Sequence, residues 1–256
     1  MICFPYRMSY ISNISETGFL CSALWHPRTP RWSTAATLNI EKANTMKLTI
    51  FGATGATGTC LTGQALAGGH DVTAVVRDPA RLAIPAHPQL RVVTADVMDP
   101  ASITPAIAGA DAVISAVGPR GTGPTTVIQD SVRSIIQAMQ KTGTLRLLEV
   151  SGSIVADEGE SPYMRYLIKP VARRTFLRHV CADMRHGEDQ IRASNLDWTI
   201  VRPPALTGKP ATGTYRTAID RNLPHGFSVS RADLAACMLT LLGDPATVHR
   251  HVAIAS

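Results

Sequence analysis

Three evenly spaced glycines, Gly52, Gly55 and Gly58, stand in the stretch TIFGATGATGTC, directly after an apolar run that reads as a strand. In a strand–turn–helix unit, such glycines let the backbone turn tightly, approach a pyrophosphate and pack helix against strand. The N-terminus of the helix then offers unpaired N–H groups and a positive dipole end to the phosphates. This context indicates a dinucleotide site. The spacing is GxxGxxG rather than GxGxxG, and the alternative is that Gly55 and Gly58 serve packing only.

Apolar strand-like runs alternate with helical patterns along the rest of the chain. This order is typical of βαβ units and a parallel sheet that helices cover on both faces. We therefore predict a doubly wound α/β fold of the Rossmann type, with a small C-terminal region of substrate loops. The predicted strands cover residues 47–51, 71–76, 90–97, 111–117, 145–151, 197–202 and 251–255. The predicted helices cover residues 57–67, 101–110 and 125–141, a segment ending near 194, and residues 230–242, which begin with a Ser230/Asp233 capping box.

The first 45 residues differ from the rest of the chain, because they show no sustained period and are rich in Ser and Thr. We predict an irregular or disordered extension over 1–45 and a dinucleotide-binding domain over 46–256. The extension is either an organelle transit peptide or an upstream, non-native start of the reading frame, since Met46 opens a domain-like sequence.

Composition narrows the function classes. The net charge of +6 suits an anionic ligand, but no nucleic-acid motif accompanies it, so we expect no nucleic-acid partner. The five cysteines are widely spaced and form no CxxC, which argues against a disulfide framework or a metal site and favours a reducing, cytoplasmic location. The apolar run 232–242 is too short to cross a bilayer, so we expect no membrane association.

The end of the second predicted strand bears on the choice of cofactor. An NAD site usually has an acidic residue there, whereas this chain has Arg77, with Arg81 one helical turn further on. A guanidinium suits a 2′-phosphate because it is planar, charged and bidentate. We therefore predict NADPH rather than NADH. The alternative is a surface ion pair of Arg77 with Asp78 or Glu41.

Two further predicted strands end near Asp96-Val97 and Gly118. Ligands of open α/β sheets bind at the carboxyl ends of the strands, so both positions are expected at the cofactor. Asp96 would accept a hydrogen bond from the adenine, and Gly118 would let the backbone pass close to the cofactor. Turn chemistry explains either residue equally well.

The motifs GATGATG, VVRDPARL, ADVMDP, LLEVS and SNLDWTIVRPPALTG together resemble the atypical short-chain dehydrogenases that include biliverdin-IXβ reductase, also called flavin reductase. The similarity runs from Met46 almost to the C-terminus. It implies a Rossmann-type sheet, NADPH as cofactor, and reduction of flavins, quinones or linear tetrapyrroles. Relatives of the NmrA type instead bind the cofactor and act as sensors through a protein partner.

The resemblance also assigns roles to individual residues. Arg77 would hold the 2′-phosphate, and Ser151 would lie near the nicotinamide, with Ser153 as the alternative. Ala205 stands where biliverdin-IXβ reductase has a histidine, which argues against a tetrapyrrole substrate. The other implied cofactor contacts are Gly52, Thr54, Gly55, Thr57 and Gly58 at the pyrophosphate, Asp96 and Val97 at the adenine, Gly118 at the ribose, and the cofactor-lining pair Pro203 and Pro204.

The Tyr-xxx-Lys pair of typical short-chain dehydrogenases is absent, because Leu167 and Pro170 stand four residues after Tyr163 and Tyr166. Pro170 should also prevent an uninterrupted helix through Tyr166 and Lys169. Reduction of a simple ketone needs a positioned acid, whereas a conjugated acceptor spreads the charge and takes its proton from water. We therefore predict hydride transfer from NADPH to a flat small-molecule acceptor, with positioning as the main source of catalysis.

Two features leave alternatives open. A sensor that binds NADP(H) and a nucleotide-sugar epimerase compete with the reductase, although the missing tyrosine weakens the epimerase. The basic stretch of residues 163–187 either steers an anionic substrate such as FMN or forms a solvated face. Its basic residues are Arg165, Lys169, Arg173, Arg174, Arg178 and Arg185.

Overall fold

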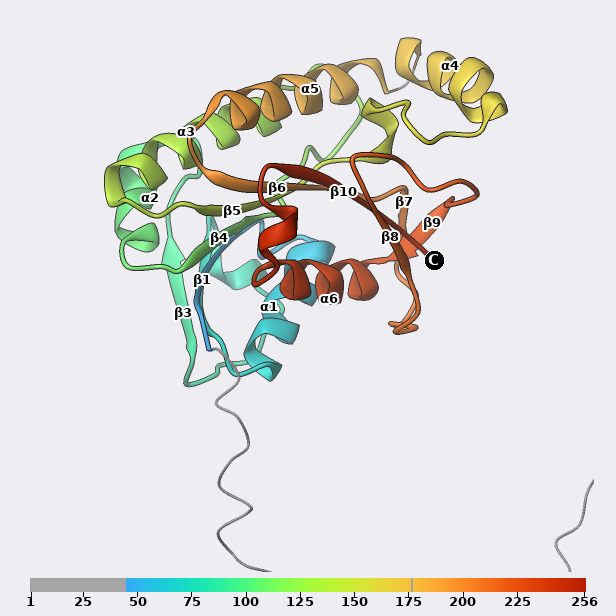
Figure 1. Ribbon diagram of the computed structural model, residues 1–256. Coiled ribbons are helices and arrows are strands. Elements are labelled where there is room, and N and C mark those ends of the chain that lie inside the picture. The colour runs from blue at the N-terminus through green and yellow to red at the C-terminus, as the bar shows by residue number, and fades with distance from the viewer. Residues whose placement is uncertain (1–44, 176) are drawn as a thin grey trace, which may run out of the picture. The chain divides into compact units, whose positions relative to one another are not determined.

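The computed structural model describes residues 45–175 and 177–256. Most of the expected 1–45 extension therefore lies outside the described residues. The described chain forms a mostly parallel eight-stranded sheet flanked by helices, which confirms the predicted Rossmann-type fold (Figure 1). The strands of this sheet, in spatial order, are β3 (Leu90–Thr94), β2 (Asp71–Val76), β1 (Lys47–Phe51), β4 (Ala112–Ser115), β5 (Arg146–Val150), β6 (Asp197–Arg202), β10 (Arg250–Ala255) and β8 (Arg216–Ile219).

The strand order reverses direction between β1 and β4, which are parallel neighbours. Such a reversal opens a crevice at the carboxyl ends of the two strands, and ligands of open α/β sheets bind there. The edge strand β8 alone runs antiparallel to its neighbour in this sheet, β10. Each predicted strand of the sheet is present with ends within three residues of those predicted, whereas β8 has no counterpart in the prediction.

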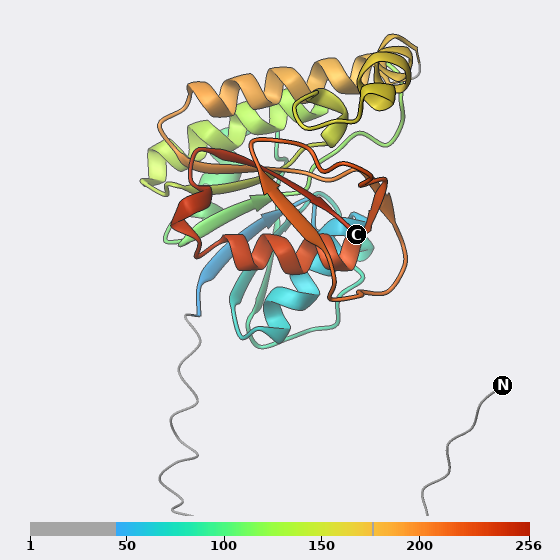
Figure 2. The ribbon, with the colours of Figure 1, turned by 45° about the vertical axis from the view of Figure 1, so that its right-hand side comes forward.

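Helices cover both faces of the sheet, and each face has its own apolar core (Figures 1 and 2). One core joins the sheet to α1 (Ala56–Ala67) and α6 (Arg231–Leu241), through residues such as Leu61 and Leu234. The other core joins it to α2 (Pro100–Ile107), α3 (Val127–Thr142) and α5 (Arg178–Ala193). Burial on both faces explains why the central strands are almost continuously apolar.

The helix ends show how sequence and tertiary contacts share the capping. Gly143 ends α3 in the left-handed conformation, with φ 73°, as predicted. The N-terminus of α3 is capped from another helix, because the buried Asp183 of α5 accepts hydrogen bonds from the amides of Ile128 (3.0 Å) and Gln129 (2.8 Å). At α6, Ser230 accepts from the Asp233 amide (2.9 Å), which confirms this part of the predicted capping box.

The segment between β5 and α5 corrects one prediction. A π-helical turn, η3 (Met164–Ile168), runs directly into α4 (Lys169–Arg174), so the chain stays helical through Tyr166 and Lys169. Pro170 sits in the first turn of α4, directly after the π turn. A proline removes one N–H from the helical ladder, and a local π-type adjustment is a common way for a helix to accommodate such a change. Pro170 therefore marks the junction of two helical geometries rather than a break.

A second, two-stranded parallel sheet forms the small C-terminal region that was expected as substrate loops. It pairs β7 (Ala205–Thr207) with β9 (Ser228–Ser230), and both strands were missed by the sequence patterns. The buried Asp233 ties the intervening loop to α6, since its carboxylate accepts from the amides of Thr212 and Gly213 (both 2.9 Å).

Candidate functional site

The glycine loop joins β1 to α1 through contacts that only glycine permits at two positions. Gly52 has a φ of 78°, and a Cβ on it would lie 2.5 Å from the Ala116 carbonyl oxygen after β4. A Cβ on Gly58 would lie 2.1 Å from the Gly52 carbonyl oxygen, so this glycine packs α1 onto the end of β1. Gly58 thus has a packing role whether or not a ligand is bound.

The first turn of α1 is arranged as an anion site. Gly55 is the N-cap residue and provides no side-chain cap, while its amide donates to the Gly52 carbonyl (2.9 Å). The first amides of the helix therefore point outward without a side-chain partner, beside the predicted contacts Thr54 and Thr57. This geometry fits the pyrophosphate of a dinucleotide, and no side chain among residues 45–175 and 177–256 caps the helix in its place.

A basic cleft of about 280 Å³ adjoins the glycine loop at the end of β2. Arg77, predicted to bind a 2′-phosphate, lines it together with Arg81, Thr54 and Arg120. Among the described residues Arg77 has no ion-pair partner, and the Asp78 carboxylate instead accepts from the Ala80 amide (3.0 Å). Arg120 was not recognised from the sequence, because it follows β4 and reaches this cleft only through the sheet topology.

The other predicted adenine and ribose contacts also follow the carboxyl ends of the strands. Asp96 and Val97 lie in the loop after β3, and Asp96 accepts from the Met98 amide (3.1 Å) in a turn. Turn chemistry, the alternative weighed for Asp96, is therefore present. A Cβ on Gly118 would meet no atom within 4 Å, so the protein itself does not require glycine there. The roles of these three residues toward a cofactor stay predictions.

A second cavity, of about 410 Å³ and mainly apolar, lies at the carboxyl ends of β5 and β6. It brings together both predicted serines, Ser151 and Ser153, with the predicted pair Pro203 and Pro204 and the neighbouring Ala205. Met164, Leu177 and other apolar residues of the 160–184 segment close it from one side. Predicted residues that are more than fifty positions apart thus line one cavity.

Ser151 is held by side chains from two other elements. Its hydroxyl donates to Glu188 Oε1 of α5 (2.7 Å), and Glu188 in turn accepts from Arg202 Nε (3.0 Å) and Nη2 (2.5 Å) of β6. Both Ser151 and Glu188 are buried. The sequence pointed to neither Glu188 nor Arg202, because an ion pair between a helix and a strand fourteen residues later leaves no local pattern.

A second buried carboxyl lies on β5, two residues before Ser151. Glu149 is 2% exposed, and neither of its oxygens has a well-oriented hydrogen-bond partner. Burial raises the pKa of Glu149 well above its ordinary value, the neighbouring Ser115 hydroxyl opposes this, and the charge of Glu188 adds to it. The charged form of Glu149 is therefore disfavoured at this site, whereas Glu188 is paired with a guanidinium.

Lys169 is a structural cation. Its ammonium is paired with Glu160 and donates to the carbonyls of Ser153 (2.6 Å) and Ala156 (2.7 Å). Burial lowers the pKa of Lys169, and the Glu160 carboxylate opposes that shift. Lys169 therefore fixes the loop after β5, including Ser153, and its buried side chain also lines the cavity that contains Ser151.

Arg173 is also held inward, because it is paired with Asp157 and donates to the Ile154 and Ala156 carbonyls, whereas the other four basic residues and the two tyrosines of this segment face outward. Arg165, Arg174, Arg178 and Arg185 are exposed, as a solvated face requires. Tyr163 and Tyr166 are 62% and 72% exposed, and neither lines the cavity that holds Ser151. The structure therefore places no tyrosine hydroxyl of the described chain in this cavity.

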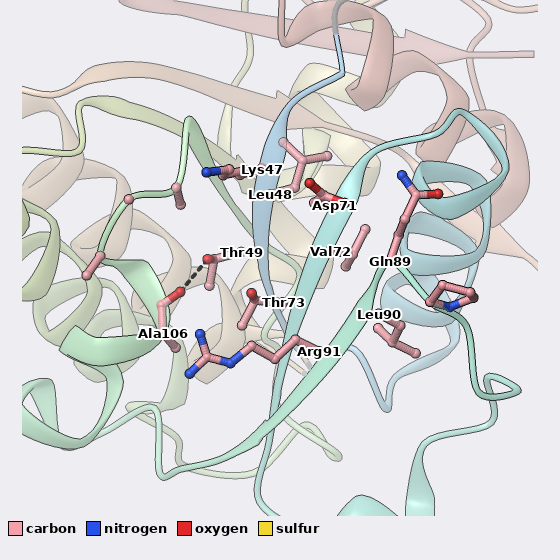
Figure 3. Close-up of a pocket in the computed structure, with 14 residues that line it drawn as sticks. Lys47, Leu48, Thr49, Asp71, Val72, Thr73, Gln89, Leu90, Arg91 and Ala106 are labelled. Carbon is pink, nitrogen blue, oxygen red and sulfur yellow. Dashed lines mark hydrogen bonds between the residues drawn. The ribbon is translucent and has the colours of Figure 1, made fainter.

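Another cavity, of about 380 Å³, lies at the amino ends of β1, β2 and β3 (Figure 3). Lys47, Asp71 and Arg91 line it, and Thr49 donates from its hydroxyl to the Ala106 carbonyl (2.7 Å) beside it. It lies at the edge opposite the glycine loop and contains none of the predicted site residues. We assign it no part in cofactor binding.

The fold and the glycine loop define an NAD(P)-binding protein of the Rossmann type, and comparison with known proteins agrees. The chain matches the sequence profile of an NAD(P)H-binding family over residues 52–245. It belongs to this family.

Two relatives of known sequence extend the comparison. The protein YMR090W of Saccharomyces cerevisiae is 30% identical over 158 residues, which cover 59% of this chain and 65% of the yeast protein. The chloroplastic protein At2g34460 of Arabidopsis thaliana is 32% identical over 202 residues, covering 75% of this chain and 70% of the relative. The alignments thus span about two thirds of the length of these relatives.

Solved structures share the fold at low sequence identity. The oxidoreductase ylbE of Lactococcus lactis superposes with a TM-score of 0.70 at 21% identity, covering 82% of this chain and 91% of that one. A short-chain dehydrogenase/reductase of Veillonella parvula, solved in complex with NADP, superposes with a TM-score of 0.68 at 18% identity, covering 82% and 94%. None of the helices in the described part of the chain is long and apolar enough to traverse a bilayer.

Proposed function

We propose that the protein is an NADPH-dependent reductase that transfers hydride to a conjugated small-molecule acceptor. A flavin or quinone suits it better than a tetrapyrrole, since Ala205 replaces the family histidine. The proposal rests on one observation above all, namely that a mainly apolar cavity with two serines, and with no tyrosine of the described chain, lies at the carboxyl ends of β5 and β6. Lys169, Glu160 and His225 also line this cavity, but the Lys169 ammonium is engaged by Glu160 and two carbonyls. Such a site can hold two flat rings together, whereas reduction of a simple ketone needs an acid positioned at the alkoxide.

The chain's own residues divide the work in this proposal. The α1 amides hold the pyrophosphate and Arg77, Arg81 and Arg120 surround the 2′-phosphate. Ser151 orients the edge of a bound ring, and the apolar walls of the cavity exclude water from the transfer. NADPH supplies the hydride when bound.

A panel of acceptors tests the reaction. The full chain should oxidise NADPH with FMN or a soluble quinone, measured by the loss of NADPH absorbance. Turnover with a simple ketone or aldehyde should be far slower, because no tyrosine is placed to protonate an alkoxide. Fast ketone reduction would contradict the proposed mechanism. Tight NADPH binding without turnover of any acceptor would favour the sensor of the NmrA type instead.

The preference for NADPH has its own test in Arg77→Asp. Losing one charge-assisted pair with the 2′-phosphate should weaken NADPH binding about ten- to hundredfold and leave NADH binding little changed. Arg91→Asp is the matched control, because it makes the same charge change on the neighbouring strand at the opposite edge of the sheet. Equal dissociation constants of NADPH and NADH in the wild-type protein would contradict the assignment.

An epimerase acting on a nucleotide sugar is the weaker candidate. Epimerases of this fold need an acid–base group beside the nicotinamide, and both tyrosines of the 160–170 segment are exposed and outside the cavity. In the function we propose, NADPH therefore passes its hydride to a second small molecule that leaves as the reduced product.

A further inference from the structure

Ser151 separates two cavities of different character. On one side lies the mainly apolar cavity at the ends of β5 and β6, which Ser151 lines. On the other lies a charged cavity of about 510 Å³, which Glu188, Arg202 and His251 line. Ser151 is 6% exposed, and its hydroxyl is bonded toward the charged side.

The charged side fixes the direction of the Ser151 hydrogen bond. Glu188 accepts two hydrogen bonds from the Arg202 guanidinium and one from Arg192 Nη1 (3.4 Å), so three N–H groups are directed at its carboxylate. A carboxylate only accepts hydrogen bonds, and a serine hydroxyl has one proton to donate. The Ser151 proton is therefore committed to Glu188 Oε1, and only lone pairs face the apolar cavity.

The geometry points to a ligand edge that carries an N–H donor. We infer that Glu188 and Arg202 make Ser151 an obligate hydrogen-bond acceptor, so that the cavity selects a planar ring with an amide or imide N–H at this point. The inference rests on the proposed function and deepens it. Two ligands of that function carry such a group, the carboxamide of the nicotinamide and the imide of an isoalloxazine. Quinone carbonyls, which only accept, do not pair with Ser151 in this state.

The buried carboxyl group of Glu149 does not supply an alternative donor to the cavity. It lies two residues before Ser151 on β5 and is buried, and it lines neither of the two cavities. Glu188 is therefore the positioning residue of this arrangement, and it acts through Ser151.

The experiment compares ligands that differ only in the N–H group, using the full chain. One arm measures the dissociation constants of NADP⁺ and of its 3-acetylpyridine analogue, in which a methyl group replaces the amide nitrogen. The other arm measures lumiflavin and 3-methyl-lumiflavin on the protein saturated with NADP⁺. In one of the two arms the ligand without the N–H should bind about two- to tenfold more weakly, as expected for one hydrogen bond. The arm in which this occurs identifies the group that Ser151 contacts.

Three variants test whether the difference in binding between ligands with and without the N–H group comes from Ser151. Ser151→Ala should abolish it, because the accepting oxygen is gone while Glu188 keeps its pairing with Arg202. Glu188→Gln should reduce it, because an amide no longer fixes the direction of the serine proton. Asp189→Asn is the matched control, since it neutralises the adjacent, exposed carboxylate on the same helix and should leave the discrimination unchanged.

Equal binding of the paired ligands in both arms, or discrimination that survives in Ser151→Ala, would overturn the inference. Ser151→Ala decides the matter even if Glu188→Gln does not fold. A wild-type protein that binds no NADP⁺ at all would contradict the proposed function, and the inference with it. NADP⁺ binding without discrimination in either arm contradicts the inference alone.

Discussion

At the glycine loop, backbone packs against backbone, whereas at the ends of β5 and β6 buried side chains from distant elements hold the cavity together. Gly58 and Gly52 lie six residues apart and meet with no side chain between them. Ser151, Glu188 and Arg202 come from β5, α5 and β6 and are joined by charge-assisted hydrogen bonds. The glycine loop thus depends on a short local motif, whereas the cavity at the ends of β5 and β6 depends on long-range contacts between side chains.

The largest effect on stability should come from removing the buried ammonium of Lys169, which holds the loop after β5 next to this cavity. We expect Lys169→Met to lower the free energy of unfolding by about 3–5 kcal/mol, because it leaves Glu160 and two carbonyls without their buried partner. Lys141→Met, at an exposed lysine in the last turn of α3, is the control and should change it by less than about 0.5 kcal/mol. Urea unfolding measures both. Similar losses in the two variants would show that burial of Lys169 does not matter.

Gly58→Ala tests the backbone packing of the glycine loop. Alanine stabilises a helix by about 1 kcal/mol relative to glycine, but its Cβ would overlap the Gly52 carbonyl. We therefore expect the free energy of unfolding to fall by about 1–3 kcal/mol and NADPH binding to weaken. Gly118→Ala makes the same chemical change where no protein atom lies within 4 Å. It should leave the melting temperature unchanged. A stable Gly58→Ala variant with normal NADPH affinity would refute the packing argument.

The raised pKa of the buried Glu149 should make the stability of the protein depend on pH. A raised pKa means that the folded state keeps its proton while the unfolded state loses it above a pH of about 4.3. Wild-type stability should therefore fall with rising pH by up to about 1.4 kcal/mol per unit, from that point to the pKa of folded Glu149. Glu149→Gln lacks this slope, so its stability relative to wild type should increase with pH. Denaturation at pH 5, 6 and 7 measures the difference, and parallel curves would argue against a neutral Glu149.

The smallest effect should come from the exposed tyrosines. Tyr163→Phe and Tyr166→Phe remove hydroxyls that lie outside the cavity, so kcat and KM for NADPH oxidation should stay within experimental error of wild type. Ser151→Ala provides the contrast, with a two- to about twelvefold loss of turnover, the range for one hydrogen bond of ~0.5–1.5 kcal/mol. Loss of turnover in either tyrosine variant, with NADPH binding intact, would require an acid-dependent carbonyl reduction instead.

The elements that the sequence patterns predicted share one property, namely that their signals are local. The strands at Lys47–Phe51, Asp71–Val76 and Asp197–Arg202 have the predicted bounds, since each is a short apolar run between turn residues. The short strands β7 and β9 carry no such signal, because three residues are too few for a period. The prediction that Pro170 would interrupt the helix at Tyr166 and Lys169 was wrong, since a π turn joins directly to α4 there.

What the sequence by itself determined is the alternation of strands and helices and the glycine loop between β1 and α1. Periodicity sets the alternation of strands and helices, and the glycines at 52, 55 and 58 report a turn that few other residues can make. The cavity at the ends of β5 and β6 was decided by the tertiary structure. In the sequence, Lys169 resembles an ordinary surface lysine and Glu188 an ordinary acidic residue of a helix. The structure shows that both side chains are buried. Buried charge is then tolerated only where partners such as Glu160 and Arg202 arrive from other elements. Those partners are brought together by the closing of the sheet and its helices, which no short stretch of the chain encodes.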